Sequence, residues 1–99
     1  MKKTIQLKQT DFGEEYISVL WSILEIRKAR RSLYGDTFKE MPSLGHYYHA
    51  FNKMHRLQMQ LTNELKSGKV NTKNYEKIED NAIDIINYLI FFLITRRME

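Results

Sequence analysis

The chain has 99 residues, of which 42% are hydrophobic and 28% are charged, with one proline and no cysteine. This composition is typical of a single globular, mostly helical domain, and the lack of cysteine excludes disulfides, thiolate metal ligands and cysteine nucleophiles. Lysine and arginine outnumber aspartate and glutamate by 16 to 12, and the resulting charge of +4 favours polyanionic partners such as phosphorylated small molecules or nucleic acid.

Two features bear on where the protein works. The first residues, MKKTIQLKQTDF, contain no apolar segment after the lysines, so we expect no export signal. The apolar run from Ile85 to Ile94 is far shorter than the roughly 20 residues that a membrane span needs. We therefore expect a cytoplasmic protein with no membrane partner.

The N-terminal third contains one predicted helix. Residues 1–9 are expected to form a polar arm, and residues 10–99 are expected to form a single helical domain. Asp11 and Glu14 have the spacing of a capping box, and apolar residues with helical spacing follow them. The pattern predicts a helix from about Asp11 to Leu33.

Two further helices follow, from about Ser43 to Lys66 and from about Asn74 to Arg96, with Ser43 as a suitable N-cap. The apolar stripe of the second helix consists of Tyr47, Phe51, Met54, Leu57, Leu61 and Leu65. Its polar edge carries His46, His49, Lys53, Arg56 and Gln60. The apolar stripe of the third helix consists of Tyr75, Ile78, Ala82, Ile85, Leu89, Phe92 and Leu93. These patterns predict an all-α fold with three long helices in an up-down-up bundle, completed by homo-oligomerisation.

The third helix also carries a row of carboxylates. Glu76, Asp80 and Asp84 follow one another at i, i+4 spacing, and Asn87 falls within the same arc of about 80° on a helix. Such a face is either solvated or able to hold a divalent cation. Because the helix is apolar nearly all round from Ile83 to Ile94, we expect Asp84 and Asn87 to lie in or beside a second packing interface, near a metal, a basic residue or a ligand.

Two residue pairs of the second helix have competing explanations. His46 and His49 have i, i+3 spacing and could join a metal site, but a polar edge or a phosphate contact beside Lys53 is the favoured interpretation. Tyr47 belongs to the apolar stripe, which we expect to form the core, so Tyr48 is left as the candidate for stacking on a base.

Three short motifs together resemble a known family. They are YGDTF at Tyr34–Phe38, KMHRL at Lys53–Leu57 and EKIEDNAIDIINY at Glu76–Tyr88. In this order they resemble the phage nucleotide-modification-associated domain family, which is itself similar to the all-α MazG and dUTPase-like nucleotide pyrophosphatases. The resemblance covers roughly residues 28–93.

The resemblance implies a phosphorylated nucleotide, or a molecule derived from one, as the ligand. It implies a Mg²⁺ site formed by Glu76, Asp80 and Asp84. It implies two phosphate-facing cations, Lys53 and Arg56. It implies that Tyr34 and Asn87 shape the nucleotide pocket. For a phage-encoded protein, the location would be the cytoplasm of the infected cell.

The chain also departs from the MazG pattern. A paired-glutamate EExxE motif on the preceding helix is missing, because the chain offers only Glu14, Glu15 and the isolated Glu25. Asn52 stands where an aspartate is usual. These departures raise the question whether the protein cleaves the nucleotide that it binds.

Three functional hypotheses follow. The first is a magnesium-dependent nucleotide pyrophosphatase that acts in nucleotide-pool or DNA-modification metabolism. The second is a non-catalytic protein that sequesters a nucleotide signal of host immunity and so acts against host defence. The third is non-specific binding of nucleic acid, which would use the basic cluster Arg27, Lys28, Arg30 and Arg31. We rank the third hypothesis below the other two.

Overall fold

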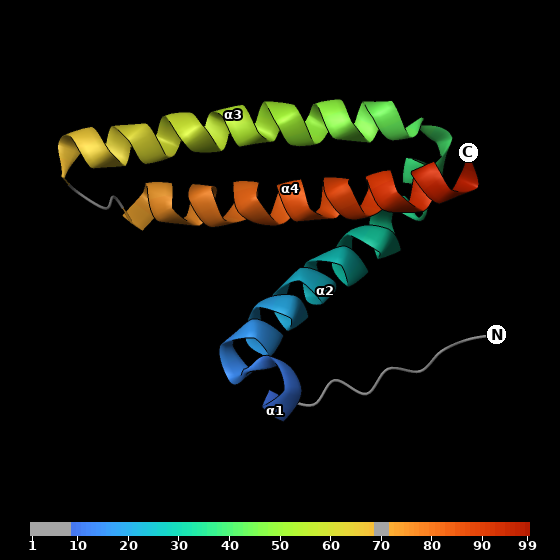
Figure 1. The fold of residues 1–99 in the computed structure, drawn as a ribbon, viewed down its shortest axis with the longest axis horizontal. Helices are drawn as coiled ribbons and strands as arrows, with labels where there is room; N and C mark the ends of the chain where they lie inside the picture. Colours follow the sequence, from blue (N-terminus) through green and yellow to red (C-terminus); the bar gives the residue numbers. More distant parts are fainter. Residues whose placement is uncertain (1–8, 69–71) are drawn as a thin grey trace. The chain divides into compact units, whose positions relative to one another are not determined.

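Helices account for nearly all of the chain that the structure describes. The computed structural model describes the backbone of residues 9–68 and 72–99 and the side chains of residues 11–68 and 78–99 (Figure 1). In chain order the elements are α1 (Gln9–Phe12), α2 (Glu14–Tyr34), the 3₁₀ helix η1 (Thr37–Glu40), α3 (Ser43–Ser67) and α4 (Thr72–Met98). These ranges contain no strand, so the predicted all-α class is confirmed.

The chain divides into two compact units, Met1–Gly35 and Asp36–Glu99. The three predicted long helices are present as α2, α3 and α4, but their up-down-up arrangement involves both units and stays a prediction. The same holds for homo-oligomerisation and for a single domain over residues 10–99. The predicted arm, residues 1–9, lies outside the described residues except at its last position.

In the first unit, a glycine interrupts the single helix that the sequence predicts. Gly13 has a φ angle of 90°, a conformation that residues with a β-carbon rarely adopt, and it separates α1 from α2. The N–H of Ile17 donates to the carbonyl of Gly13 at 3.2 Å, and this hydrogen bond closes the first turn of α2. Gly35 then ends α2, since its N–H donates to the carbonyl of Arg31 at 2.8 Å.

The second unit is a helical hairpin. Figure 1 shows α3 and α4 side by side and antiparallel, and η1 contacts α4. The observed bounds of α3 and α4 agree with the predicted bounds to within two residues. Gly68 ends α3 in the left-handed conformation, with its N–H donating to the carbonyl of Glu64 at 3.0 Å.

Pairs of polar and aromatic side chains line the contact between α3 and α4, which we call the seam. The residues that meet across the seam are Ser43 with Glu99, His46 with Phe91, His49 with Tyr88, Lys53 with Asp84, and Gln60 with Asn81. The pairs follow in opposite order along the two helices, as antiparallel packing requires. Specific partners therefore fix the register of the hairpin, because a shift by one turn would separate all of them.

The apolar stripe predicted for the second helix does not face α4. Within this stripe, Leu57 is half-buried and its other members are exposed: Tyr47, Phe51, Met54, Leu61 and Leu65. The side of α3 that packs on α4 is the polar edge, together with the small, buried Ala50. The expectation that this stripe forms the core is wrong for the hairpin, because the polar edge finds matching partners on α4.

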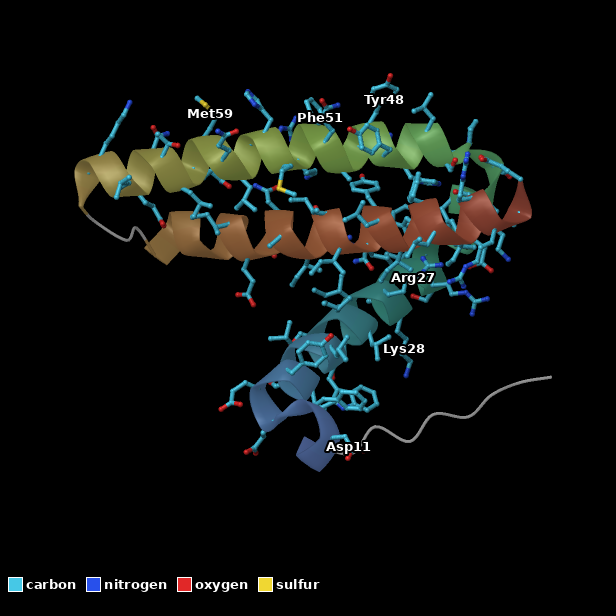
Figure 2. All side chains as sticks on the ribbon, viewed as in Figure 1. Asp11, Arg27, Lys28, Tyr48, Phe51 and Met59 are labelled. Atoms are coloured by element: carbon cyan, nitrogen blue, oxygen red, sulfur yellow. The ribbon has the colours of Figure 1, made fainter. Side chains whose placement is uncertain are left out.

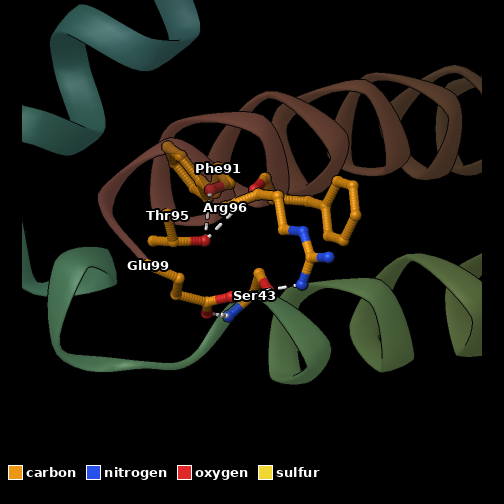
Figure 3. Close-up of polar contacts among 6 residues, drawn as sticks. Ser43, Phe91, Thr95, Arg96 and Glu99 are labelled. Atoms are coloured by element: carbon orange, nitrogen blue, oxygen red, sulfur yellow. Dashed lines mark hydrogen bonds and ion pairs between the residues drawn. The ribbon is translucent and has the colours of Figure 1, made fainter.

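One end of the seam is closed by a cap on α3. The carboxylate of Glu99 accepts hydrogen bonds from the backbone N–H and the hydroxyl of Ser43, both at 2.8 Å (Figure 3). The prediction of Ser43 as the N-cap is wrong, because Pro42 occupies the N-cap position and Ser43 is the first residue of α3. Glu99 satisfies the N–H of Ser43 in place of a local cap. These bonds lower the pKa of Glu99, and the neighbouring Arg96 guanidinium, 3.5 Å away, lowers it further.

None of the described helices is both long enough and apolar enough to cross a membrane.

Candidate functional site

An ion pair joins the two helices in the middle of the seam. The ammonium of Lys53 lies 3.2 Å from the carboxylate of Asp84, and the two side chains are 25% and 16% exposed. A pair this sheltered is screened less by water and salt than a surface pair. The sequence predicted that Asp84 would lie near a metal, a basic residue or a ligand, and the basic residue is Lys53.

A stacked pair of rings lies next to the ion pair. His49 is one helical turn before Lys53, and Tyr88 is one turn after Asp84. Their rings are nearly parallel, with centroids 5.1 Å apart and an interplanar angle of 16°. A cation, a carboxylate, an imidazole and a phenol ring are therefore held in adjacent layers. We call Lys53, Asp84, His49 and Tyr88 the seam site.

Two exposed charges flank the seam site on the same side of the hairpin. Arg56 follows Lys53 by three residues, and Asp80 precedes Asp84 by four, so each lies on the same side of its helix as its neighbour in the ion pair. Since α3 and α4 are antiparallel, Arg56 and Asp80 also occupy the same layer. This face presents two cations and two carboxylates to solvent or to a ligand.

The predicted pocket residue Asn87 is buried. Only 5% of Asn87 is exposed, and its amide nitrogen has no hydrogen-bond partner among the described residues. A buried amide without a partner is costly, so this group is suited to donate to a ligand or to water. Asn87 lies three residues after Asp84, as the predicted arc required.

The predicted metal site is described only in part. The side chain of Glu76 lies outside the described residues, Asp80 is exposed, and Asp84 faces Lys53. In the part of the chain with described side chains, no group of three histidine, aspartate or glutamate residues is close enough to hold a metal ion. An ammonium beside Asp84 would compete with Mg²⁺ for its oxygens, so the metal site stays a prediction that depends on Glu76.

His46 belongs to an aromatic cluster and not to the seam site. Its ring is only 3% exposed, and its Nε2 lies 2.8 Å from the carbonyl of Phe38. Since a carbonyl only accepts, Nε2 must carry the proton. Phe38 also stacks on Phe91, with centroids 4.2 Å apart, so this cluster ties η1 to the hairpin. The alternative of a metal-binding role for His46 finds no support in these contacts.

Tyr48 is not brought to the seam site, and Tyr34 lies in the other compact unit. Tyr48 is exposed and lies about 140° around α3 from Lys53, so it faces away from the ion pair. Figure 2 shows Tyr48 on the side of α3 that faces away from α4, together with Phe51 and Met59. Tyr34 ends α2 in the other compact unit and is also exposed.

Tyr88 is the functional candidate that the sequence reasoning missed. The signal was present, because Tyr88 closes the acidic motif and lies one turn after Asp84 on the same side of the helix. The ring that sequence analysis chose, Tyr48, stands next to a tyrosine of the apolar stripe. Only the seam, which joins two helices, shows which ring meets His49.

Comparisons of this chain with protein-family models, with curated proteins and with solved structures found no match.

Proposed function

We propose that the protein binds a phosphorylated nucleotide, or a molecule derived from one, at the seam site. The observation that carries the proposal is the sheltered Lys53–Asp84 pair with the stacked His49 and Tyr88 rings one turn away. A nucleotide needs a cation for its phosphate, a ring plane for its base and polar groups for its base edge or ribose. The hairpin presents all three along one face.

The cations would hold the phosphate. Lys53 is positioned by Asp84 yet keeps part of its surface in solvent, so a phosphate can approach it without displacing a buried group. Arg56, one turn away, offers a guanidinium that can bind phosphate oxygens in pairs. The positive charge of the whole chain favours the approach of such an anion.

The rings would hold the base. His49 is exposed and Tyr88 is half-buried, so their stack has one accessible end on which a base can lie. Asp84 and the unpartnered amide of Asn87 would then select hydrogen-bonding groups on the base or ribose. A non-catalytic protein with this site would sequester its ligand intact, as expected for an inhibitor of nucleotide signalling in host defence.

A second candidate, a nucleotide pyrophosphohydrolase, is favoured by the spacing of Asp80 and Asp84 and by the resemblance to MazG-like enzymes. Two carboxylates beside a bound phosphate repel it unless a cation lies between them. Glu76, Asp80 and Asp84 would hold Mg²⁺, which supplies charge neutralisation and an activated water. In this scheme Lys53 keeps Asp84 in place and Arg56 faces the phosphates.

The test is to incubate the purified protein with linear and cyclic nucleotides, with Mg²⁺ or with a chelator, and to analyse the free and the denatured-protein fractions by chromatography. Depletion of one intact nucleotide, with full recovery after denaturation, supports binding without cleavage. New monophosphate and pyrophosphate products that require Mg²⁺ support the hydrolase. No depletion and no product across the panel would overturn both candidates.

Two matched variants tie either result to the seam site. Lys53→Met removes the ammonium at the site and should weaken binding at least tenfold. Lys66→Met removes the same charge from the exposed last turn of α3 and should leave binding unchanged. Equal effects of the two variants would mean that only overall charge matters, which is the behaviour of a non-specific nucleic-acid binder.

A further inference from the structure

The exposed face of α3 has the spacing of a coiled-coil seam. Its large apolar residues recur at alternating steps of three and four over about 33 Å of helix, interrupted once by a glutamine. In order they are Leu44, Tyr47, Phe51, Met54, Gln58, Leu61 and Leu65. The six apolar members of this series are all exposed. Part of the series lines a shallow groove, formed by Met54, Leu57, Gln58, Leu61, Thr62 and Leu65.

α4 carries a second apolar stripe, whose residues also recur at alternating steps of four and three. Its members are Ile78, Ala82, Ile85, Leu89 and Phe92, with Leu93 beside them. Ile85 is buried, whereas Leu89 and Leu93 are exposed. The α4 stripe is therefore only half covered by α3.

Helix geometry places the two stripes on one face of the hairpin. Met54 follows Lys53 directly and therefore lies about 100° further around α3. Ile85 follows Asp84 directly and lies about 100° further around α4. Lys53 and Asp84 face each other, and the two helices run in opposite directions. Equal rotations therefore carry both stripes to the same side, opposite the face with Arg56 and Asp80. We call this side the apolar face.

We infer that the apolar face binds a second copy of the same hairpin, so that two chains form an antiparallel four-helix bundle. The two-fold axis would run between the two copies of α3, perpendicular to both, at the level of Met54, which is the midpoint of the α3 stripe. In this arrangement Phe51 of one protomer packs near Gln58 of the other, and the two Met54 side chains meet. The sequence predicts an oligomer, and the structure assigns it to this face, which leaves the seam site open.

Charge and length favour a second copy over other occupants. On α3 the face has no lysine, arginine, aspartate or glutamate between Leu44 and Leu65, so two identical faces can meet without repulsion. A partner must also present an apolar stripe of the same spacing over three heptads, and an identical hairpin presents this stripe.

The chain offers a matched pair of methionines for the test. Met54 lies in the α3 stripe and Met59 lies about 140° away around the helix, yet they are 52% and 54% exposed. We expect the wild-type chain to sediment with twice its monomer mass at micromolar concentration. Met54→Lys should weaken dimerisation at least tenfold, and Met59→Lys should leave it unchanged. Circular dichroism will confirm that both variants keep their helices.

A cross-linking experiment tests the position of the axis. The natural chain has no cysteine, so a single introduced thiol reports only on its own position. Met54→Cys should form a disulfide-linked dimer on mild oxidation, and Met59→Cys should not. A monomeric wild-type chain would overturn the inference. So would a dimer that Met59→Lys disrupts as strongly as Met54→Lys, or one that Met54→Cys fails to cross-link.

Discussion

The seam and the apolar face of the α3–α4 hairpin reverse the usual distribution of side chains. The seam, which holds the two helices together, consists largely of charged, amide and aromatic partners such as Lys53 with Asp84. The apolar face, which carries Phe51, Met54 and Leu61, is exposed. In an ordinary hairpin the apolar stripe would form the contact.

This difference indicates separate roles for the seam and the apolar face. Polar partners give a unique register but bury little apolar area, so they contribute specificity more than stability. An apolar stripe at heptad spacing contributes stability, but only when another stripe covers it. The hairpin is therefore well defined by itself and, on our inference, is completed by a second copy.

The largest expected effect is at the aromatic end of the seam, where apolar and polar contacts coincide. Phe91 stacks on Phe38 and packs against His46, so Phe91→Ala removes the contacts that tie η1 to the hairpin. We expect a loss of about 3 kcal/mol in the free energy of unfolding, measured by urea denaturation. Leu33→Ala, at an exposed position of α2, is the control and should change stability by less than about 0.5 kcal/mol. Similar losses for both variants would show that the cluster is not a stabilising centre.

A double-mutant cycle on Lys53 and Asp84 tests whether the seam is held by specific pairs. Lys53→Met removes the ammonium that pairs with the sheltered carboxylate of Asp84 and should cost about 1–2 kcal/mol, reduced from the value for fully buried pairs because both side chains keep some exposure. Adding Asp84→Asn should restore part of that loss, giving a coupling free energy near 1 kcal/mol. Strictly additive losses would mean that the ion pair does not stabilise the hairpin.

Completing the heptad repeat of the apolar face should strengthen self-association. Gln58 is the one polar member of the α3 stripe, and the proposed dimer places it near Phe51 of the partner chain. Gln58→Leu should lower the dimer dissociation constant about tenfold, which corresponds to about 1.4 kcal/mol. Analytical ultracentrifugation over a dilution series measures this shift. An unchanged constant would place Gln58 outside the interface.

Sequence periodicity was enough to predict the helices but not their neighbours. The bounds of α3 and α4 follow from Gly68 and the apolar spacing to within two residues, although Pro42, and not the predicted Ser43, occupies the N-cap of α3. The break at Gly13 was missed because a glycine between helical residues is compatible with either a continuous or a broken helix until its φ angle is known.

At the candidate site too, the sequence predicted features of single helices but not the contacts between helices. Periodicity correctly placed Asp84 and Asn87 in sheltered surroundings, because the helix becomes apolar around them. It could not show that Lys53 lies beside Asp84, or that Tyr88 meets His49, because these contacts join residues on different helices. Periodicity also assigned the α3 apolar stripe to the core, since an amphipathic pattern does not reveal whether the covering surface belongs to the same chain.

The smallest expected effect concerns the cap on α3, and it depends on pH. The backbone N–H and the hydroxyl of Ser43, followed by Arg96, lower the pKa of Glu99 below its ordinary value of 4.5. A carboxyl whose pKa is lower in the folded state stabilises that state above its unfolded pKa, and the contribution disappears as the pH falls through the folded pKa. Glu99→Gln should therefore lower the melting temperature slightly at pH 7, while at an acid pH below the folded pKa of Glu99 the difference from the wild-type chain should vanish. Thermal melts at both pH values measure this difference. A difference that persists at acid pH would show that Glu99 acts through packing and not through its charge, and the seam would then lack an ionic cap at this end.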